Sequence, residues 1–409
     1  MEKKNILFII PWLPYPMVSG GHQALYNGIL AIKNDFNVYV VYEKQIGNDE
    51  AEEHFREFFP NAVLLPFSYC KMSLNERIAS LLHALIRKLF RERMTDEDIM
   101  CNRWVKTISP HKKEFVMHID KVCHTYNFDI IQVEMPWLIS LVLSLPKQSK
   151  RIYVHHEVGF VCRELEKQTF QNNIYVDSCK AYADLNEVSL LNMYDKVITL
   201  SPIDREKLLK NGVVAPISTS FAVVNFEFES NVKYCDGNHL TFVGPDGHLP
   251  NLVGILWFLE NCWDMIKEKS PQMHLSIIGK WSDAHMQEIS SKYKDVDFLG
   301  FVDNLQECLQ GTIMIVPITI GSGIRMKILE ACSMGVPFVC TSVGAEGIPV
   351  SNGETCFLAD TPELFVEGII KLKNKEIQDK FIKNAKRLVL EHYSLDSLRK
   401  NRIAIYEDM

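Results

Sequence analysis

Two cations and one carboxylate follow a glycine-rich turn in the second half of the chain. In order, this segment contains Gly321, Ser322, Gly323, Ile324, Arg325, Lys327 and Glu330, and the apolar run 313–318 before it predicts a buried strand. A helix that begins after such a turn attracts anions, because its free N–H groups and its dipole face that end. The cations suit a diphosphate and the carboxylate suits ribose hydroxyls, although a capped surface helix with one ion pair fits the pattern equally well.

Two segments that carry histidines in the first half are further candidates. Gly20-Gly21-His22 lies between a predicted strand and a predicted helix, and is either a second anion-binding helix entry or an ordinary tight turn. His155 and His156 end another predicted strand, so their side chains point to opposite faces of the sheet. One ring is expected to face a ligand and the other to pack inside, and we slightly favour His155 as the first.

Apolar strands alternate with amphipathic helices along the chain, which predicts an α/β fold with parallel sheets covered on both faces. The strands are expected at 5–10, 37–42, 62–66, 130–133, 151–154, 196–200, 240–243, 274–278, 296–299, 313–316 and 338–340, and the clearest helices at 23–33 and 178–193. A chain of 409 residues exceeds one ordinary core and suggests two Rossmann-like domains. We expect these domains at 1–222 and 239–389, joined by a linker over 223–238.

The glycine-rich segment also resembles a known signature. Gly321-Ser-Gly-Ile-Arg-Met-Lys-Ile-Leu-Glu-Ala331 is similar to the donor-binding motif of the family 4 retaining glycosyltransferases. Weaker matches occur in the family's order at Pro14-Tyr-Pro16, Gly20-Gly21, Val154-His-His156, Asp195-Lys-Val-Ile-Thr-Leu-Ser201, Phe242-Val-Gly244, Pro250-Asn251, Trp257-Phe258, Ile278-Gly279, Phe298-Leu-Gly-Phe-Val-Asp303 and Gly344-Ala-Glu-Gly-Ile348. The resemblance implies the GT-B fold, in which two Rossmann-like domains face each other across a cleft and a tail, here 390–409, returns to the first domain.

The resemblance implies roles for individual residues. Arg325 and Lys327 would stabilise a departing diphosphate, and one of His155 and His156 would hydrogen-bond the transferred sugar. The other residues expected around the donor are Gly20, Gly21, His22, Gly244, Gly279, Val302, Gly321, Ser322, Gly323, Ile324, Glu330 and Glu346. Ser322 departs from the family pattern, because many members have a glutamate at that position. Glu346 either contacts sugar hydroxyls or is a charge on a loop.

The implied activity is transfer of a sugar from a UDP- or GDP-sugar to a glycan or lipid-linked acceptor, with retention of the anomeric configuration and without a metal or other cofactor. Bacterial surface polysaccharide or glycoconjugate synthesis is the expected context. Three alternatives stay open: a GT-B nucleotide-sugar epimerase, a non-catalytic nucleotide-sugar binding protein and a dinucleotide-dependent oxidoreductase. The glycine turns lack the full Gly-x-Gly-x-x-Gly spacing after a first strand, which disfavours the oxidoreductase.

The composition limits the partners and the compartment. A net charge of −7 argues against a nucleic-acid binder, which needs a basic surface. The 11 cysteines are odd in number and include no Cys-x-x-Cys pair, so we expect reduced thiols in a cytoplasmic protein. Asp96-Glu-Asp98 and Asp295-Val-Asp297 imitate a metal-binding motif, but neither follows a buried strand into a cleft, and no metal is expected.

Residues 71–93 have the pattern of a basic amphipathic helix. Apolar residues recur there at helical spacing, together with the cations Arg77, Arg87, Lys88, Arg91 and Arg93. Such a basic amphipathic helix either lies on an anionic membrane or packs its apolar stripe into a core. No apolar run approaches the roughly 20 residues of a membrane span, so the sequence predicts at most peripheral contact at the inner membrane face.

Overall fold

The protein is described by a computed structural model that covers residues 3–17, 19–44, 49–69, 82, 95–170, 173–224 and 237–409. The chain divides into two compact units, which are residues 1–220 with 402–409 (unit 1) and residues 221–401 (unit 2). Most of the linker expected over 223–238 lies outside the described residues, as does the basic segment 71–93 apart from Leu82. These two expectations stay predictions.

Unit 1 is built on a seven-stranded parallel sheet with the order β3-β2-β1-β4-β5-β6-β7. Its strands are β1 (Asn5–Ile9), β2 (Asn37–Glu43), β3 (Val63–Phe67), β4 (Ile130–Glu134), β5 (Lys150–His155), β6 (Lys196–Thr199) and β7 (Ile217–Thr219). The six strands expected in this half are confirmed. The seventh, β7, was not predicted, because three half-buried residues at a sheet edge give too short a pattern.

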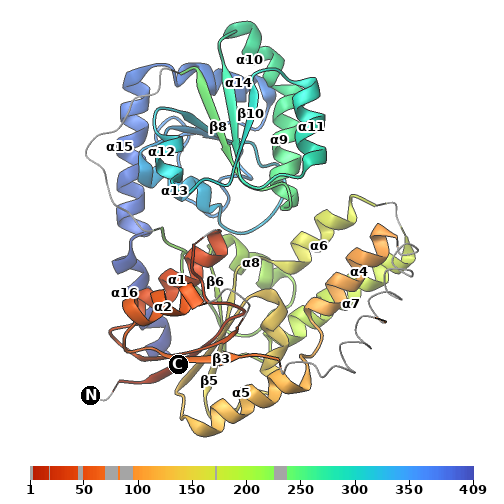
Figure 1. Ribbon diagram of the computed structural model, residues 1–409, viewed down its shortest axis with the longest axis vertical. Helices are drawn as coiled ribbons and strands as arrows, with labels where there is room; N and C mark the ends of the chain where they lie inside the picture. The colour runs from red at the N-terminus through yellow and green to blue at the C-terminus, as the bar shows by residue number, and fades with distance from the viewer. Residues whose placement is uncertain are drawn as a thin grey trace. The chain divides into compact units, whose positions relative to one another are not determined.

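Helices cover this sheet. They are α1 (Gly20–Ile32), α2 (Asp49–Phe58), α4 (Asp96–Thr107), α5 (Lys113–Thr125), the 3-10 helix η1 (Pro136–Leu143), α6 (Gly159–Lys167), α7 (Ile174–Leu191) and α8 (Pro202–Lys210). The long helix α7 packs along α4 (Figure 1). Local caps set the starts of these helices: Ser19 caps α1, and Thr95 forms a capping box with Asp98 at α4.

Unit 2 repeats this architecture with a six-stranded parallel sheet of order β10-β9-β8-β11-β12-β13. Its strands are β8 (His239–Val243), β9 (His274–Ile278), β10 (Val296–Gly300), β11 (Ile313–Val316), β12 (Phe338–Cys340) and β13 (Phe357–Leu358). Five of the six were expected, and β11 and β12 are fully buried, as their continuous apolar sequences require. The exception is β13, whose two residues are too few for any periodicity.

The helices of unit 2 lie on both faces of its sheet. They are α9 (Leu249–Asn261), α10 (Trp263–Lys269), α11 (Asp283–Lys292), α12 (Leu305–Leu309), α13 (Met326–Met334), α14 (Pro362–Lys371) and α15 (Lys375–His392). Figure 1 shows α9 and α11 on one side of the strands, and α13 and α15 on the other. The two parallel α/β sheets confirm the predicted fold class.

Both sheets reverse their strand order at one point. In unit 1 the chain moves from β1 to β2 and β3 on one side, and continues from β4 on the other side of β1. In unit 2 the same reversal separates β8 from β11. Ligands of open parallel sheets bind outside the carboxyl ends of the strands at such a reversal. The segments after β1, β4, β8 and β11 are therefore the places to look for a site.

The end of the chain belongs to unit 1. Helix α16 (Leu395–Glu407) follows α15 after a break at Tyr393 and Ser394, and residues 402–409 group with unit 1. The Lys196 ammonium lies 2.9 Å from an Asp408 carboxylate oxygen, and the Tyr406 ring meets Phe36 edge-on at 5.4 Å between centroids. Of the helices in the described part of the chain, none has the length and apolar character that crossing a bilayer requires.

Two helical glycines allow a matched test of how closely α9 packs on the end of β11. A Cβ added at Gly254 in α9 would lie 2.7 Å from the Pro317 carbonyl oxygen, whereas one added at Gly28 in α1 would meet nothing within 4 Å. Alanine favours a helix over glycine by about 0.5–1 kcal/mol. Gly28→Ala should therefore raise the melting temperature of unit 1, while the backbone clash makes Gly254→Ala lower that of unit 2. Scanning calorimetry measures both, and a stabilising Gly254→Ala would contradict the close packing of α9 on the strand end.

Candidate functional site

The turn between β11 and α13 requires its glycines. Gly321 has φ +120° and Gly323 has φ +82°, and both values favour glycine over any residue with a side chain. A Cβ at Gly321 would also lie 2.7 Å from an Arg325 Nη2 atom and 3.0 Å from Pro250. The turn is thus closely packed between the helix that follows it and the start of α9.

Arg325 is the residue just before α13 and is folded onto this turn. Its Nη1 donates to the Gly323 carbonyl oxygen at 2.6 Å and also to the Ser322 carbonyl oxygen, and only 6% of the residue is exposed. Ser322 is likewise buried, at 3% exposure. The guanidinium therefore shapes the turn and adds a positive charge at the N-terminus of a helix whose dipole has the same sign there.

Lys327, in the first turn of α13, is held in a partly apolar environment. Its Nζ donates to Asn251 Oδ1 at 2.7 Å and lies 4.6 Å from the centroid of the Phe242 ring. Burial lowers the pKa of Lys327 to about 7, and the neighbouring Arg325 charge adds to this effect, while Glu330 opposes it. Because a nearby anion favours the charged form of a lysine, binding of an anion beside Lys327 would favour uptake of a proton.

Asn251 in α9 connects Lys327 to the end of β8. Its Nδ2 donates to the Pro245 carbonyl oxygen at 3.0 Å, and its side chain is so close to Gly244 that a Cβ there would approach to 2.5 Å. Gly244 itself has φ +149°. The segment after β8, where the family resemblance places donor contacts, is thus joined to the cation of α13 by one amide side chain.

The ends of β9 and β10 complete the same edge of the sheet. The Gly279 amide donates to the Gly300 carbonyl oxygen at 2.8 Å, and the Trp281 indole N–H donates to the Gly244 carbonyl oxygen at 2.9 Å. A Cβ at Gly279 would lie 2.8 Å from Gly244. Val302 is half-buried in the segment just beyond β10. These contacts bring Gly244 and Gly279 together, with Val302 beyond the adjacent strand end.

The turn after β12 also lies at this edge. The Thr341 hydroxyl donates to the Ile318 carbonyl oxygen, beyond β11, and accepts from the Gly344 amide at 2.9 Å. Glu346, in the same turn, and Glu330, in α13, are both half-buried. Ile324 is half-buried as well. The donor-site residues predicted for unit 2 thus all lie in the segments that follow the carboxyl ends of β8 to β12.

Unit 1 carries an aromatic surface at the reversal of its own sheet. Trp12 follows β1 and Trp137 follows β4, with ring centroids 5.5 Å apart, and Trp137 is 40% exposed. His22 stacks on Trp12 at 5.3 Å, and its Nδ1 lies 2.7 Å from the Ser19 hydroxyl that caps α1. Burial lowers the pKa of His22. Gly21 packs against Met135, since a Cβ there would lie 3.3 Å from its terminal methyl group.

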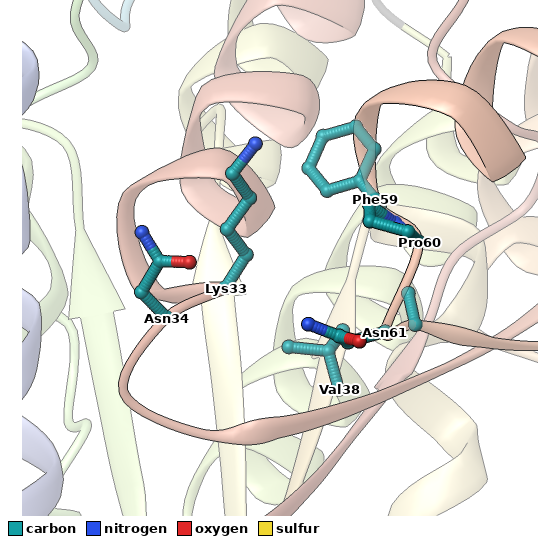
Figure 2. A pocket seen from close by; sticks show the side chains of 7 residues that line it. Lys33, Asn34, Val38, Phe59, Pro60 and Asn61 are labelled. Carbon is teal, nitrogen blue, oxygen red and sulfur yellow. The ribbon is translucent and has the colours of Figure 1, made fainter.

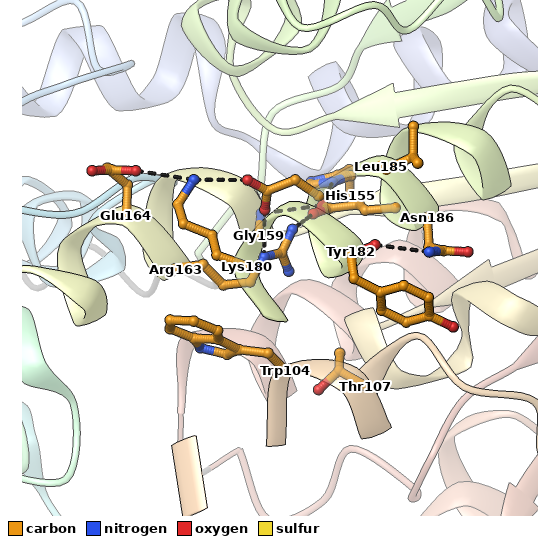
Figure 3. Close-up of polar contacts among 12 residues, drawn as sticks. Trp104, Thr107, His155, Gly159, Arg163, Glu164, Lys180, Tyr182, Leu185 and Asn186 are labelled. Atoms are coloured by element: carbon orange, nitrogen blue, oxygen red, sulfur yellow. Dashed lines mark hydrogen bonds and ion pairs between the residues drawn. The ribbon is translucent and has the colours of Figure 1, made fainter. Parts of the chain in front are cut away.

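His155 is the buried member of the histidine pair. Its Nε2 lies 3.1 Å from Glu187 Oε1, and Glu187 also accepts from the Gly159 amide at 3.2 Å and from Arg163. Figure 3 shows this network of α6 and α7 around His155, Gly159 and Arg163. Only 2% of His155 is exposed. The side chain thus packs inside, which argues against our slight preference for His155 as the ring that faces a ligand.

His156 is the more exposed ring of the two and points away from that network. Its Nε2 lies 2.8 Å from Glu134 Oε2, at the end of the neighbouring strand β4. Glu134 is almost fully buried, at 2% exposure. The opposite orientation of the two rings, expected from the pleat, therefore assigns packing to His155 and leaves His156 as the candidate for binding.

The two Asp-x-Asp sequences have local structural roles. Asp98 closes the capping box of α4, Asp295 pairs with Lys267 at 2.7 Å and Asp297 pairs with His274 at 2.9 Å. Within the described ranges, no group of three or more histidine, cysteine and acidic residues is arranged to hold a metal ion.

A small cavity of about 130 Å³ lies at the other end of the unit 1 sheet. Figure 2 shows the residues around it, which are Lys33, Asn34, Val38, Phe59, Pro60, Asn61 and Ala62. Lys33 already donates to the Phe58 carbonyl oxygen at 2.8 Å and lies 5.2 Å from the Phe59 ring. The cavity lies beside the amino end of β2. It is therefore remote from the carboxyl ends of the strands, where the candidate residues lie.

Sequence reasoning missed several residues of these arrangements. Asn251 was noted only as part of a motif, and Trp12, Glu134 and Trp137 were given no role. A signal was available, because each tryptophan follows a predicted strand at its carboxyl end and Glu134 comes directly after the predicted strand 130–133. Their mutual contacts depend on strand order, which the sequence alone does not reveal.

Two parallel α/β units with these sheets define the GT-B fold of glycosyltransferases. The chain superimposes on S. aureus TarM, in complex with fondaparinux, alpha-GlcNAc-glycerol and UDP, with TM-score 0.69, 11% identity and coverage of 98% of this chain and 99% of that one. It superimposes equally on Anabaena Alr3699/HepE in complex with UDP-glucose, with TM-score 0.68, 13% identity and coverage of 99% and 100%.

Sequence comparison gives a match over part of the chain. Residues 237–375, which lie within unit 2, match the family described as Glycosyl transferases group 1. The chain is also 23% identical over 406 residues to an "Uncharacterized 44.6 kDa protein in cps region" of Klebsiella pneumoniae, covering 95% of this chain and 96% of that protein.

The buried cation gives a testable dependence on pH. The ordinary pKa of a lysine is 10.5 and that of Lys327 is about 7, so between these values the folded protein binds fewer protons than the unfolded chain. The free energy of unfolding contributed by this group therefore rises with pH across that window. The change in the melting temperature of unit 2 caused by Lys327→Met should be most favourable below about pH 7 and progressively less favourable above it. Calorimetry across this range checks the effect, and an increment independent of pH would contradict it.

Proposed function

We propose that this protein is a retaining, metal-independent glycosyltransferase that moves a sugar from a nucleotide-diphosphate donor to a carbohydrate or lipid-linked acceptor. The observation that carries the proposal is the arrangement of Arg325 and Lys327 at the N-terminus of α13, beside the sheet reversal of unit 2. A diphosphate leaving group develops negative charge as the sugar bond breaks, and preorganised cations and helix N–H groups stabilise such charge. Because these cations are part of the protein, they fill the role that a divalent metal has in other sites.

The donor would lie along the edge formed by the ends of β8 to β12. Its diphosphate would contact Lys327 and the Gly321 turn, and Glu330 would accept hydrogen bonds from the ribose. The nucleobase would lie near Gly279 and Val302. UDP is the first nucleotide to test, because the TarM structure contains UDP and the HepE structure contains UDP-glucose.

Retention without a covalent intermediate requires the diphosphate to leave and the acceptor hydroxyl to attack on the same face of the sugar. The hydroxyl proton then passes to the departing diphosphate oxygen. On this proposal His156 accepts or donates a hydrogen bond at a sugar hydroxyl and orients the anomeric carbon, without itself transferring a proton. The membership in the family 4 branch and the place in surface polysaccharide synthesis belong to the same proposal. The cps-region relative from Klebsiella pneumoniae supports that context.

The acceptor would bind to unit 1 at the aromatic surface of Trp12, His22 and Trp137. Tryptophan rings offer a rigid apolar face with a polar edge, which suits the C–H face and the hydroxyls of a pyranose. The partly exposed Trp137 ring is the available face of this group.

Nucleotide binding is the direct test of the donor site. UDP, GDP and ADP at a hundredfold over their dissociation constants should each add about 2.7 kcal/mol to the stability of the protein if they bind, and nothing if they do not. We expect the correct nucleotide to raise the melting temperature of unit 2. Failure of every nucleoside diphosphate and of the corresponding sugars to do so would refute the proposed donor site.

Removing one cation should abolish most of the turnover. Arg325→Ala removes a positive charge that we place near the departing diphosphate. The substitution should reduce the rate of sugar transfer about a hundredfold or more, because loss of a single preorganised donor can lower a catalytic rate by that factor. Lys294→Ala is the matched control, because Lys294 is an exposed cation of unit 2 that precedes β10 at the amino end of the sheet. Circular dichroism and melting temperature establish folding of both variants. Near-normal transfer by Arg325→Ala would contradict the proposed role.

The acceptor surface is tested separately. Trp137→Ala should raise the KM for the acceptor roughly tenfold, the effect of losing one stacked ring, and leave the affinity for UDP unchanged. Leu143→Ala is the control, because Leu143 is an exposed apolar residue of the same 3-10 helix, at its far end. An equal effect of both substitutions would show that Trp137 has no special contact. Product analysis in the same assay distinguishes a transferase from an epimerase, which needs no acceptor.

A further inference from the structure

A chain of buried hydrogen bonds leads from the C-terminal helix to His156. The Tyr406 hydroxyl of α16 donates to Gln132 Oε1 at 2.6 Å, and Gln132 Nε2 donates to Glu134 Oε1 at 2.5 Å. The second carboxylate oxygen of Glu134 contacts His156 Nε2 at 2.8 Å. Tyr406, Gln132 and Glu134 are exposed by 1%, 0% and 2%. All four residues belong to unit 1.

The donors and acceptors of this chain follow one direction. Gln132 turns its NH2 group toward Glu134, which accepts, and its oxygen toward Tyr406, which donates. Burial raises the pKa of Tyr406 to about 12, which keeps its hydroxyl protonated as the donor. At the other end, His156 donates from Nε2 to the carboxylate, and in the neutral imidazole this leaves Nδ1 as the acceptor nitrogen.

Packing alone does not explain these polar residues. Gln132 and Glu134 alternate along β4 with Ile131 and Val133, which belong to the apolar core on the opposite face. Apolar side chains of similar size at such positions commonly give equal or greater stability than a buried polar network. A fully connected network in a central strand instead defines the orientation of the group at its end.

We infer that Tyr406, Gln132 and Glu134 are positioning residues that hold His156 in a single orientation, with Nε2 protonated and Nδ1 presented to the substrate. Because Nδ1 without a proton is an acceptor, it would accept a hydrogen bond from a hydroxyl of the transferred sugar. This inference rests on the proposed function for the identity of that substrate, but the orientation of the ring is a property of unit 1 alone. It gives the C-terminal helix a part in the site.

The anchoring of α16 supports this role. Phe36 packs edge-on against the Tyr406 ring, and Asp408 pairs with Lys196, so contacts on both sides hold the tyrosine in place. Tyr406→Phe would retain the ring and its packing and would remove only the hydroxyl. Tyr194→Phe is a matched control, because the Tyr194 hydroxyl is a buried donor of unit 1 that bonds the Ile139 carbonyl oxygen at 2.8 Å, outside this chain.

The first experiment measures the state of the histidine directly. In ¹⁵N-labelled protein, the ring nitrogens of His156, assigned by comparison with His156→Gln, should show a single Nε2-protonated tautomer. Tyr406→Phe should convert this signal into a mixture of tautomers, whereas Tyr194→Phe should leave it unchanged. This measurement needs no substrate, so it reports on the positioning chain even if the proposed transferase activity is wrong. An identical His156 signal in wild type and Tyr406→Phe would overturn the inference.

The second experiment is a double-mutant cycle on sugar transfer. Tyr406→Phe should lower kcat roughly tenfold, the factor that loss of one hydrogen bond can cause, with little change in the KM for the donor. In a His156→Ala background the same substitution should have no further effect, because a residue that acts through His156 has nothing left to position. Equal losses in both backgrounds would show a general structural effect and overturn the inference. Tyr194→Phe should retain normal kcat throughout.

Discussion

The contact between Lys327 and Asn251 is the interaction on which the arrangement of unit 2 depends. A lysine ammonium in a partly apolar environment needs a polar partner, and Asn251 supplies it only because the end of β8 approaches closely. That approach explains why Gly244 and Gly279 have no side chains, since a Cβ at either position would meet backbone or amide atoms. The two glycines, the Asn251 amide and Lys327 therefore pack together as one unit. This packing places a positive charge at the N-terminus of α13.

Unit 1 has the same sheet architecture but a different set of buried polar contacts. Two adjacent histidines at the end of β5 point to opposite faces, and each is held by a buried glutamate from a neighbouring element. Glu187 ties His155 to the start of α6, so this ring stabilises the loop. Glu134 instead continues through Gln132 to Tyr406, and leaves the other ring with one nitrogen for a ligand. Adjacent residues of one type thus have separate tasks.

The elements of the fold followed from local patterns. Eleven strands were recognisable because most of them are largely apolar runs, as parallel strands buried on both faces require, and the start of α13 was recognisable from its glycine turn. The two strands that escaped, β7 and β13, are two or three residues long and depend on neighbours for their formation. The sequence could not decide between His155 and His156, because a strand pattern shows alternation but does not show which face carries the partner.

Residue types and spacing alone determined that the chain has parallel α/β sheets and that Gly321 to Glu330 has the chemistry of an anion site. Each of these conclusions depends on interactions between residues close in sequence. Tertiary structure decided that Asn251 holds Lys327, that Trp12 and Trp137 meet, and that Tyr406 supports His156 from 250 positions away. Such pairings depend on strand order and on the packing of the end of α16 in unit 1. The free energy that selects them comes from the whole core and not from any one segment.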